Sequence, residues 1–201
     1  MRILAVLLTT LVFTNALSAQ TAIPRDTSCT GSVIVEYERD PNLNVMVRRS
    51  DVILIGAVVE VVPPVNVDPS PRHLQIETES VVSVEQLLSG SVGNAAKIVL
   101  AQIGGNIPPY NQSVAGDPIV KEGERYVLFL RLDNRKLPTQ KPGLARFISV
   151  GVGDGMVKIV DGKVQISCAA TPELKKYHNS DFAAFVSTVR DMVALAKPLQ
   201  R

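Results

Sequence analysis

Short runs of branched apolar residues, separated by clusters of glycine and proline, recur along the chain and predict β-strands. Gly56 interrupts the second of these runs, and a glycine inside a strand typically marks a bend or bulge. Asp161 and Gly162 separate the last two runs and predict a tight hairpin turn. The runs lie at residues 31–37, 51–62, 73–87, 95–105 and 124–132, with three more between 145 and 168.

The apolar spacing changes to a helical period near both ends of this region. A short N-terminal helix is predicted, with Asp40 as its N-cap and Pro41 at its first position. A C-terminal amphipathic helix is predicted within residues 180–197, capped by Asn179 or Ser180. Its apolar stripe, which we expect to pack on the sheet of the same domain, comprises Phe182, Phe185, Val186, Val189, Met192, Val193 and Ala196.

Strands that follow one another without intervening regular helices favour a mainly β fold with an antiparallel sheet. We expect about seven or eight short strands, and a sheet of that size hides its edges by curling or closing into a barrel. The chain has 46% hydrophobic residues but only 4% aromatic ones and no Trp, so its core must rest on Val, Ile and Leu. Branched aliphatic residues favour strands, which supports the same fold class.

The first 20 residues predict a secretory signal peptide, which leaves residues 21–201 as a single domain. Arg2 precedes an apolar run over residues 3–13, and small residues follow at a plausible cleavage site. The run is shorter than a bilayer requires, and no later segment of the sequence is long and apolar enough to span one. The mature protein is therefore expected to be secreted or periplasmic, without a membrane span.

The charge balance gives the chain no electrostatic reason to bind nucleic acid. Its formal net charge is +2, and loss of Arg2 with the signal peptide leaves +1.

Cys29 and Cys168 both lie in the exported part, where disulfides persist, and we predict that they are bridged. The bridge would close a loop of roughly 140 residues and stabilise the fold by at most about 4 to 5 kcal/mol. Two free thiols are the alternative.

Residues 104–123 follow neither a helical nor an alternating pattern, and an irregular connection of that length is uncommon inside a compact domain. It is either a structural loop or a loop that contacts a ligand. The predicted contact residues are Gly104, Gly105, Asn106, Ile107, Pro108, Pro109 and Tyr110. Residues 63–72 and 133–142 form neighbouring loops that we expect to contribute.

Few residue patterns point to catalysis or metal binding. Glu77, Glu79 and Glu85 fall on one strand face, where they are either a general acid and base or, as alternation more often indicates, a water-exposed face. His73 and His178 lack the spacing of metal ligands, and no Gly-x-Ser-x-Gly sequence occurs. The sequence therefore predicts no catalytic residue, no metal site and no cofactor.

Several segments resemble a group of exported bacterial domains with an OB-like barrel, some of which occur beside matrixin-type metalloproteases. The likeness covers most of residues 48–192 and implies an OB-like barrel. It rests on "RRSDVILIGAVVEV", "VEQLLSGS", "IGG", "VAGDPIVKEGERYVLFL" and "DFAAFVSTVRDMV". The barrel is also distantly similar to the inhibitory domain of tissue inhibitors of metalloproteinases, whose N-terminal cysteine chelates zinc. In this chain the first cysteine, Cys29, is internal and no Cys-x-Cys accompanies it.

These observations favour an exported, non-enzymatic binding module whose partner is a protein in the periplasm or extracellular space, with a small ligand as a further possibility. One alternative is a protein that resembles metalloprotease inhibitors and uses residues 106–110 as a wedge. The other is a hydrolase whose site the sequence does not reveal.

Overall fold

The structure is a computed structural model that describes residues 42–68 and 74–196. The predicted signal peptide, the predicted strand at 31–37, Cys29 and His73 lie outside the described residues. The bridge between Cys29 and Cys168 therefore stays a prediction.

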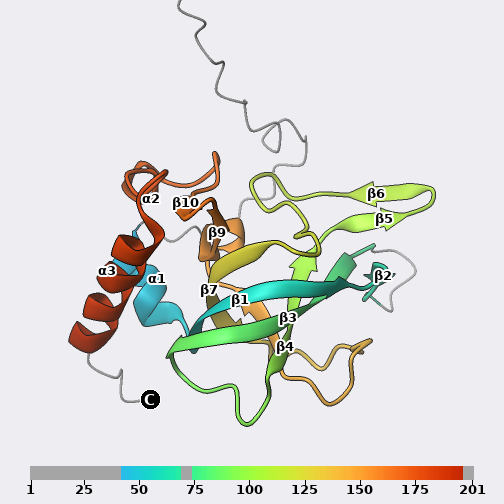
Figure 1. Cartoon of the computed structure of the whole chain (residues 1–201). Coiled ribbons are helices and arrows are strands. Elements are labelled where there is room, and N and C mark those ends of the chain that lie inside the picture. The colour runs from blue at the N-terminus through green and yellow to red at the C-terminus, as the bar shows by residue number, and fades with distance from the viewer. Residues whose placement is uncertain (1–41, 69–73, 197–201) are drawn as a thin grey trace, which may run out of the picture.

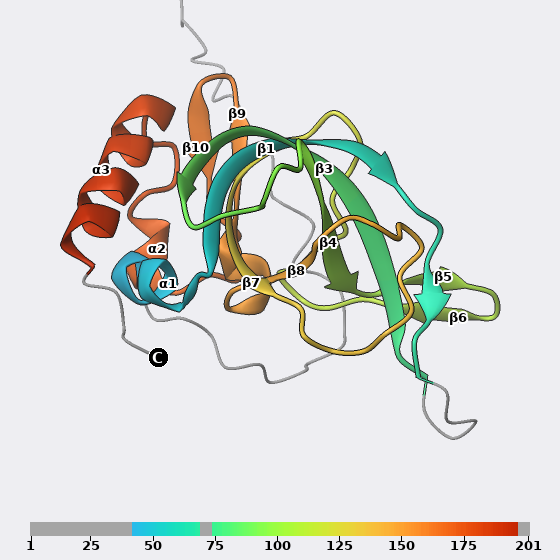
Figure 2. The ribbon, with the colours of Figure 1, turned by 90° about the horizontal axis from the view of Figure 1, so that it is seen from below.

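Five strands close into a barrel, as Figure 2 shows along its axis. In the sheet, β1 is followed by β3, β4, β8 and β7, and β7 pairs back with β1. Of the barrel pairings, only β4 with β8 is parallel, and the other four are antiparallel. The predicted OB-like barrel is confirmed. Its strands are β1 (Val52–Val61), β3 (Ile76–Ser89), β4 (Lys97–Ile103), β7 (Arg125–Leu132) and β8 (Arg146–Ser149).

Three further strands extend the barrel to an eight-stranded sheet. β9 (Met156–Val160) pairs with β7, and β10 (Lys163–Gln165) pairs with β9. Asp161 and Gly162 join β9 to β10 with φ values of 49° and 72°, the left-handed conformation that a tight hairpin turn requires, so the predicted hairpin is confirmed. β2 (Val65–Asn66) pairs with the start of β3.

Gly56 lies at a register shift between β1 and β3, where the barrel bends. A Cβ atom at this position would lie 2.6 Å from Val82 Cγ1 and 2.8 Å from the Ser83 carbonyl oxygen. The two strands therefore approach each other more closely than any side chain permits, and the predicted bend at Gly56 is confirmed.

The alternation along β7 divides the apolar side chains between two cores. Tyr126, Leu128 and Leu130 point into the barrel. Val127 and Phe129 belong to a second core, on the other face of β7, which also contains buried residues of the helices. Both faces of β7 are therefore buried between Tyr126 and Leu130, whereas Leu132 at the end of the strand is exposed.

Both predicted helices are present, but each begins at a different cap. α1 (Leu43–Arg49) is capped by Asn42, not Asp40, because the Asn42 side chain accepts a hydrogen bond from the Val45 amide at 3.0 Å. α3 (Phe182–Leu195) is capped by Asp181, which accepts from the Ala184 amide at 2.9 Å. The structure also contains α2 (Pro172–Lys175) and a 3₁₀ helix, η2 (Val152–Gly155).

The apolar stripe of α3 faces the second core, where Phe185, Val186 and Val189 are buried. α3 contacts α1 and β10, so the helices lie on one side of the barrel. Two short strands, β5 (Gly105–Ile107) and β6 (Tyr110–Gln112), project from the opposite side (Figure 1). Among the described helices, none has the length and apolar character needed to cross a membrane.

Candidate functional site

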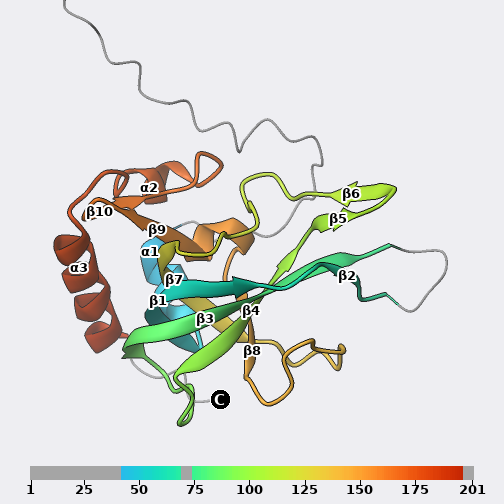
Figure 3. The same cartoon turned by 45° about the vertical axis from the view of Figure 1, so that its right-hand side comes forward.

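The predicted contact residues form a β-hairpin, not a connection without regular structure. β5 (Gly105–Ile107) and β6 (Tyr110–Gln112) pair with each other in a small sheet of their own, which projects from the barrel beside β2 (Figure 3). Pro108 and Pro109 form its turn, and the peptide bond between them is cis. Strands of three residues are too short to show a period of two, which explains why the sequence pattern did not reveal them.

The base of the hairpin is attached to the start of β3. The Gly104 amide donates to the Ile76 carbonyl at 2.8 Å, and the Thr78 hydroxyl donates to the Gly104 carbonyl at 2.7 Å. The Ile76 amide donates to the Gln112 side-chain oxygen at 2.7 Å. Thr78 is buried, so its hydrogen bond to Gly104 is shielded from water.

Glycine is required at the base by close approach as well as by backbone conformation. Gly105 has a φ of 141°, and a Cβ there would lie 2.4 Å from Pro64 Cβ. Gly104 has a φ of 123°, and its Cβ would lie 2.8 Å from the Gln112 carbonyl oxygen. The hairpin therefore packs directly on the segment that connects β1 to β2.

The tip of the hairpin is apolar and faces solvent. Pro108 and Pro109 are exposed, and Tyr110 is the most exposed aromatic residue of the described chain, at 54%. Ile107 is partly buried behind them. An apolar tip thus stands on a base whose polar groups are bonded to the barrel.

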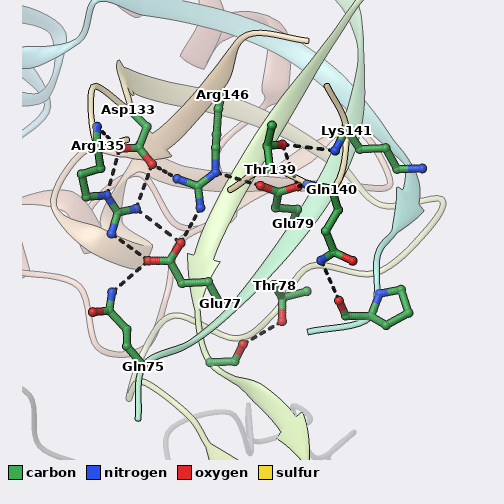
Figure 4. Close-up of polar contacts among 12 residues, drawn as sticks. Gln75, Glu77, Thr78, Glu79, Asp133, Arg135, Thr139, Gln140, Lys141 and Arg146 are labelled. Atoms are coloured by element: carbon green, nitrogen blue, oxygen red, sulfur yellow. Dashed lines mark hydrogen bonds and ion pairs between the residues drawn. The ribbon is translucent and has the colours of Figure 1, made fainter. Parts of the chain in front are cut away.

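The structure brings residues 63–68, which are the described part of one predicted loop, together with the hairpin and residues 133–142 around the first half of β3. The side chain of Gln140, in the β7–β8 connection, donates to the Pro63 carbonyl at 2.9 Å. The Gln140 amide and the Thr139 hydroxyl both donate to Glu79 Oε2, at 2.9 and 3.0 Å (Figure 4). Residues 133–142 are therefore folded back onto the sheet.

Glu77 and Glu79 are not on a water-exposed face, contrary to the prediction. Their exposed fractions are 1% and 2%, because the β7–β8 connection covers this part of β3. Glu85, farther along the same strand, is exposed and pairs with Arg125 at 2.6 Å. Burial does not alternate along β3, since Ile76–Val82 are all buried, and only the last of the three acids faces water.

Arg146 of β8 pairs with the buried acids. Its Nε donates to Glu79 Oε1 at 2.9 Å, and its two terminal nitrogens pair with Glu77 and Asp133 (Figure 4). The guanidinium group therefore contacts three carboxylates at once. It joins β3, β8 and the start of the β7–β8 connection.

Arg135 adds a second positive charge to the same group. It pairs with Glu77 at 2.7 Å and with Asp133 at 2.8 Å, and Gln75 donates to Glu77 at 2.9 Å. Donors from the chain itself therefore already occupy these carboxylates, so their observed role is to fix the loops. We call this set the carboxylate–arginine cluster; it comprises Glu77, Glu79, Asp133, Arg135 and Arg146.

Asp117 anchors the chain that returns from the hairpin to β7. The Gln102 side-chain amide donates to Asp117 Oδ1 at 3.0 Å, and the Gln102 side-chain oxygen accepts from the Val120 amide at 3.0 Å. Burial raises the pKa of Asp117 to about 6; the Gln102 hydrogen bond opposes this shift and the nearby Asp154 adds to it. The sequence pattern did not single out Asp117 as a buried acid.

A second polar group lines a pocket of about 370 Å³ between residues 116–121 and β9. Glu124 accepts from the Tyr126 hydroxyl at 2.6 Å and from Lys158 Nζ at 2.6 Å. Burial acts to raise the pKa of Glu124, but these hydrogen bonds outweigh it and hold the pKa below its usual value.

His178 lies between α2 and α3, and its Nδ1 accepts a hydrogen bond from the Ile166 amide. Within residues 42–68 and 74–196, no three His, Cys, Asp or Glu side chains are grouped to hold a metal ion.

We predict that Arg146→Met lowers the free energy of unfolding by about 3 to 5 kcal/mol, because it leaves buried carboxylates without their central counter-charge. Arg125→Met is the matched control, since its pair with Glu85 is solvent-exposed and is expected to contribute at most about 1 kcal/mol. Urea denaturation at neutral pH measures both. Equal losses in the two variants would contradict the structural role of the cluster.

Asp117 should make stability depend on pH. Its pKa is about 6 in the folded protein against 3.8 for an unperturbed Asp side chain, so the folded state binds more protons between these values and stability falls as pH rises through that window. Asp117→Asn removes this contribution. As the pH rises from 4 to 7, the free energy of unfolding of the variant should increase by up to about 3 kcal/mol relative to that of the natural protein.

Thermal or urea unfolding at several pH values measures this gain, and Asp161→Asn, at an exposed turn, controls for the loss of one carboxylate. A difference between Asp117→Asn and the natural protein that stays constant with pH would show that Asp117 does not titrate as stated.

Comparison of the chain with protein-family models finds no match, and comparison with curated proteins finds no significant match. Its function must therefore be argued from the geometry of these sites.

Proposed function

We propose that this protein is an exported, non-enzymatic binding module that recognises a protein partner. The binding surface would be centred on the hairpin tip, residues 107–110, and flanked by residues 63–68 and 133–142. The observation that carries the proposal is the combination of an exposed apolar tip with a base fixed to β3. The N-terminal sequence supports export.

A fixed hairpin favours binding because little conformational entropy is lost when the partner docks. Tyr110 is the natural anchor, since tyrosine presents a large apolar ring and a hydroxyl group with few rotatable bonds, and it is enriched among residues that dominate binding energy. Proline at the turn restricts the backbone further.

One class of partner is a metalloprotease, whose active-site cleft such a tip could enter. Inhibition of this kind would use residues 106–110 as a wedge, because the predicted mature terminus does not begin with a cysteine. A hydrolase of the serine or cysteine type would instead need a nucleophile in contact with a base. His178, the histidine within the described residues, is engaged by the Ile166 amide through one ring nitrogen, and no observation favours it as a base.

Site-specific photo-crosslinking tests the proposal. A photoreactive residue at Tyr110 should capture a specific protein from the exported fraction of the source cells, and excess natural protein should compete with that capture. The same residue placed at Arg190, exposed on α3 on the other side of the barrel, is the control. Equal labelling from both positions would count against the hairpin as the binding surface.

With the captured partner in hand, Tyr110→Ala should weaken binding at least about tenfold. Val59→Ala, which trims an exposed apolar side chain on β1, should leave the affinity within about twofold. Calorimetry on the purified pair measures both affinities, and unchanged binding by Tyr110→Ala would remove Tyr110 as the anchor.

A further inference from the structure

A pocket of about 340 Å³ opens close to the base of the hairpin, next to the carboxylate–arginine cluster. The ends of β4 and β8 and the segment that follows β8 line it, and Arg49 of α1 closes another side. Sites for small molecules usually enclose between about 300 and 1,000 Å³, so the pocket has the size of a small-ligand site.

Much of the wall is apolar. Ile103, Ile148 and Val152 remain only partly buried although they line a concave surface, and water contact with such side chains is unfavourable. A ligand that covers them would gain free energy from the apolar area removed from water. The apolar lining comprises Ala101, Ile103, Ile148, Val150 and Val152.

Two arginine side chains of the β7 region also line the pocket. Arg135 is held in place by its pairs with Glu77 and Asp133, so its guanidinium group is oriented in advance. Arg131 lies opposite Ile148 in the register of β7 and β8. Within the described part of the chain, the guanidinium group of Arg131 makes no hydrogen bond or ion pair, so its charge is not balanced by a direct partner.

The acids at the pocket are already engaged. Glu77 accepts hydrogen bonds from Arg135, Arg146 and Gln75. Asp117 accepts from the Gln102 amide. Neither carboxylate pairs with Arg131, so this guanidinium remains available to a ligand.

We propose that the pocket binds a small organic carboxylate with an apolar body. The planar guanidinium fork of Arg131 matches a carboxylate, with which arginine forms two parallel hydrogen bonds. The apolar wall formed by Ile103, Ile148 and Val152 accommodates the rest of the ligand. This site is distinct from the hairpin tip and does not depend on the protein-binding proposal.

Hexanoate is a suitable probe, with hexanamide as its neutral counterpart and inorganic phosphate as an anion without an apolar body. Titration of the full mature protein, followed by amide chemical shifts, should show saturable binding of hexanoate with the largest shifts at Ile103, Ile148 and Val152. Hexanamide and phosphate should each bind at least about tenfold more weakly.

Arg131→Gln should weaken hexanoate binding at least about tenfold, and Arg131→Lys, which keeps the charge but not the planar fork, should fall between it and the natural protein. Arg190→Gln, at an exposed arginine of α3, is the matched control and should bind as the natural protein does. A thermal midpoint close to that of the natural protein, without ligand, verifies that each variant is folded.

Several results would overturn the proposal. One is that the largest changes in amide chemical shift lie elsewhere on the barrel. Another is that hexanoate and hexanamide bind with equal affinity. Phosphate that binds as tightly as hexanoate would exclude the apolar body as part of recognition. Equal affinities of the Arg131→Gln and Arg190→Gln variants would exclude Arg131 as the carboxylate partner.

Discussion

The contact of Arg146 with Glu77, Glu79 and Asp133 is the constraint on which the proposed binding surface depends. Buried carboxylates are tolerated only when they are paired and hydrogen-bonded. Arg146 reaches Glu77 and Glu79 from β8, and the loop that covers them supplies further donors. That burial holds residues 133–142 against β3. The loop in turn contacts Pro63, the neighbour of the residue on which Gly105 packs.

The hairpin therefore projects from a region in which neighbouring segments restrain one another. Its base bonds to Ile76 and Thr78, next to the two buried acids in the same strand. Rigid elements position recognition groups more accurately than free loops do, which is why an exposed tip on such a base is suited to binding. The arginine-lined pocket shares Glu77 and Arg135 with the cluster, so the same ion pairs also shape a small-ligand site.

The sequence predicted β7 and α3 because their apolar periods are long, as the alternating faces of β7 show. It misplaced the helix caps, since Asp40 and Asn42 are both good capping residues and only the backbone geometry selects one. It missed the burial of Glu79, whose partner Arg146 lies 67 residues farther along the chain. The hairpin escaped detection because its strands have three residues each.

Hydrogen exchange in the free protein is the most direct test of the fixed hairpin base. The Gly104 amide donates to the Ile76 carbonyl, and the Ile76 amide donates to Gln112, so both should exchange at least roughly 100-fold more slowly, relative to unstructured peptide rates, than the amide of the exposed Gly143. Exchange of Gly104 and Ile76 at the unprotected rate would show that the hairpin is mobile at its base, and would contradict a binding surface that is formed before the partner arrives.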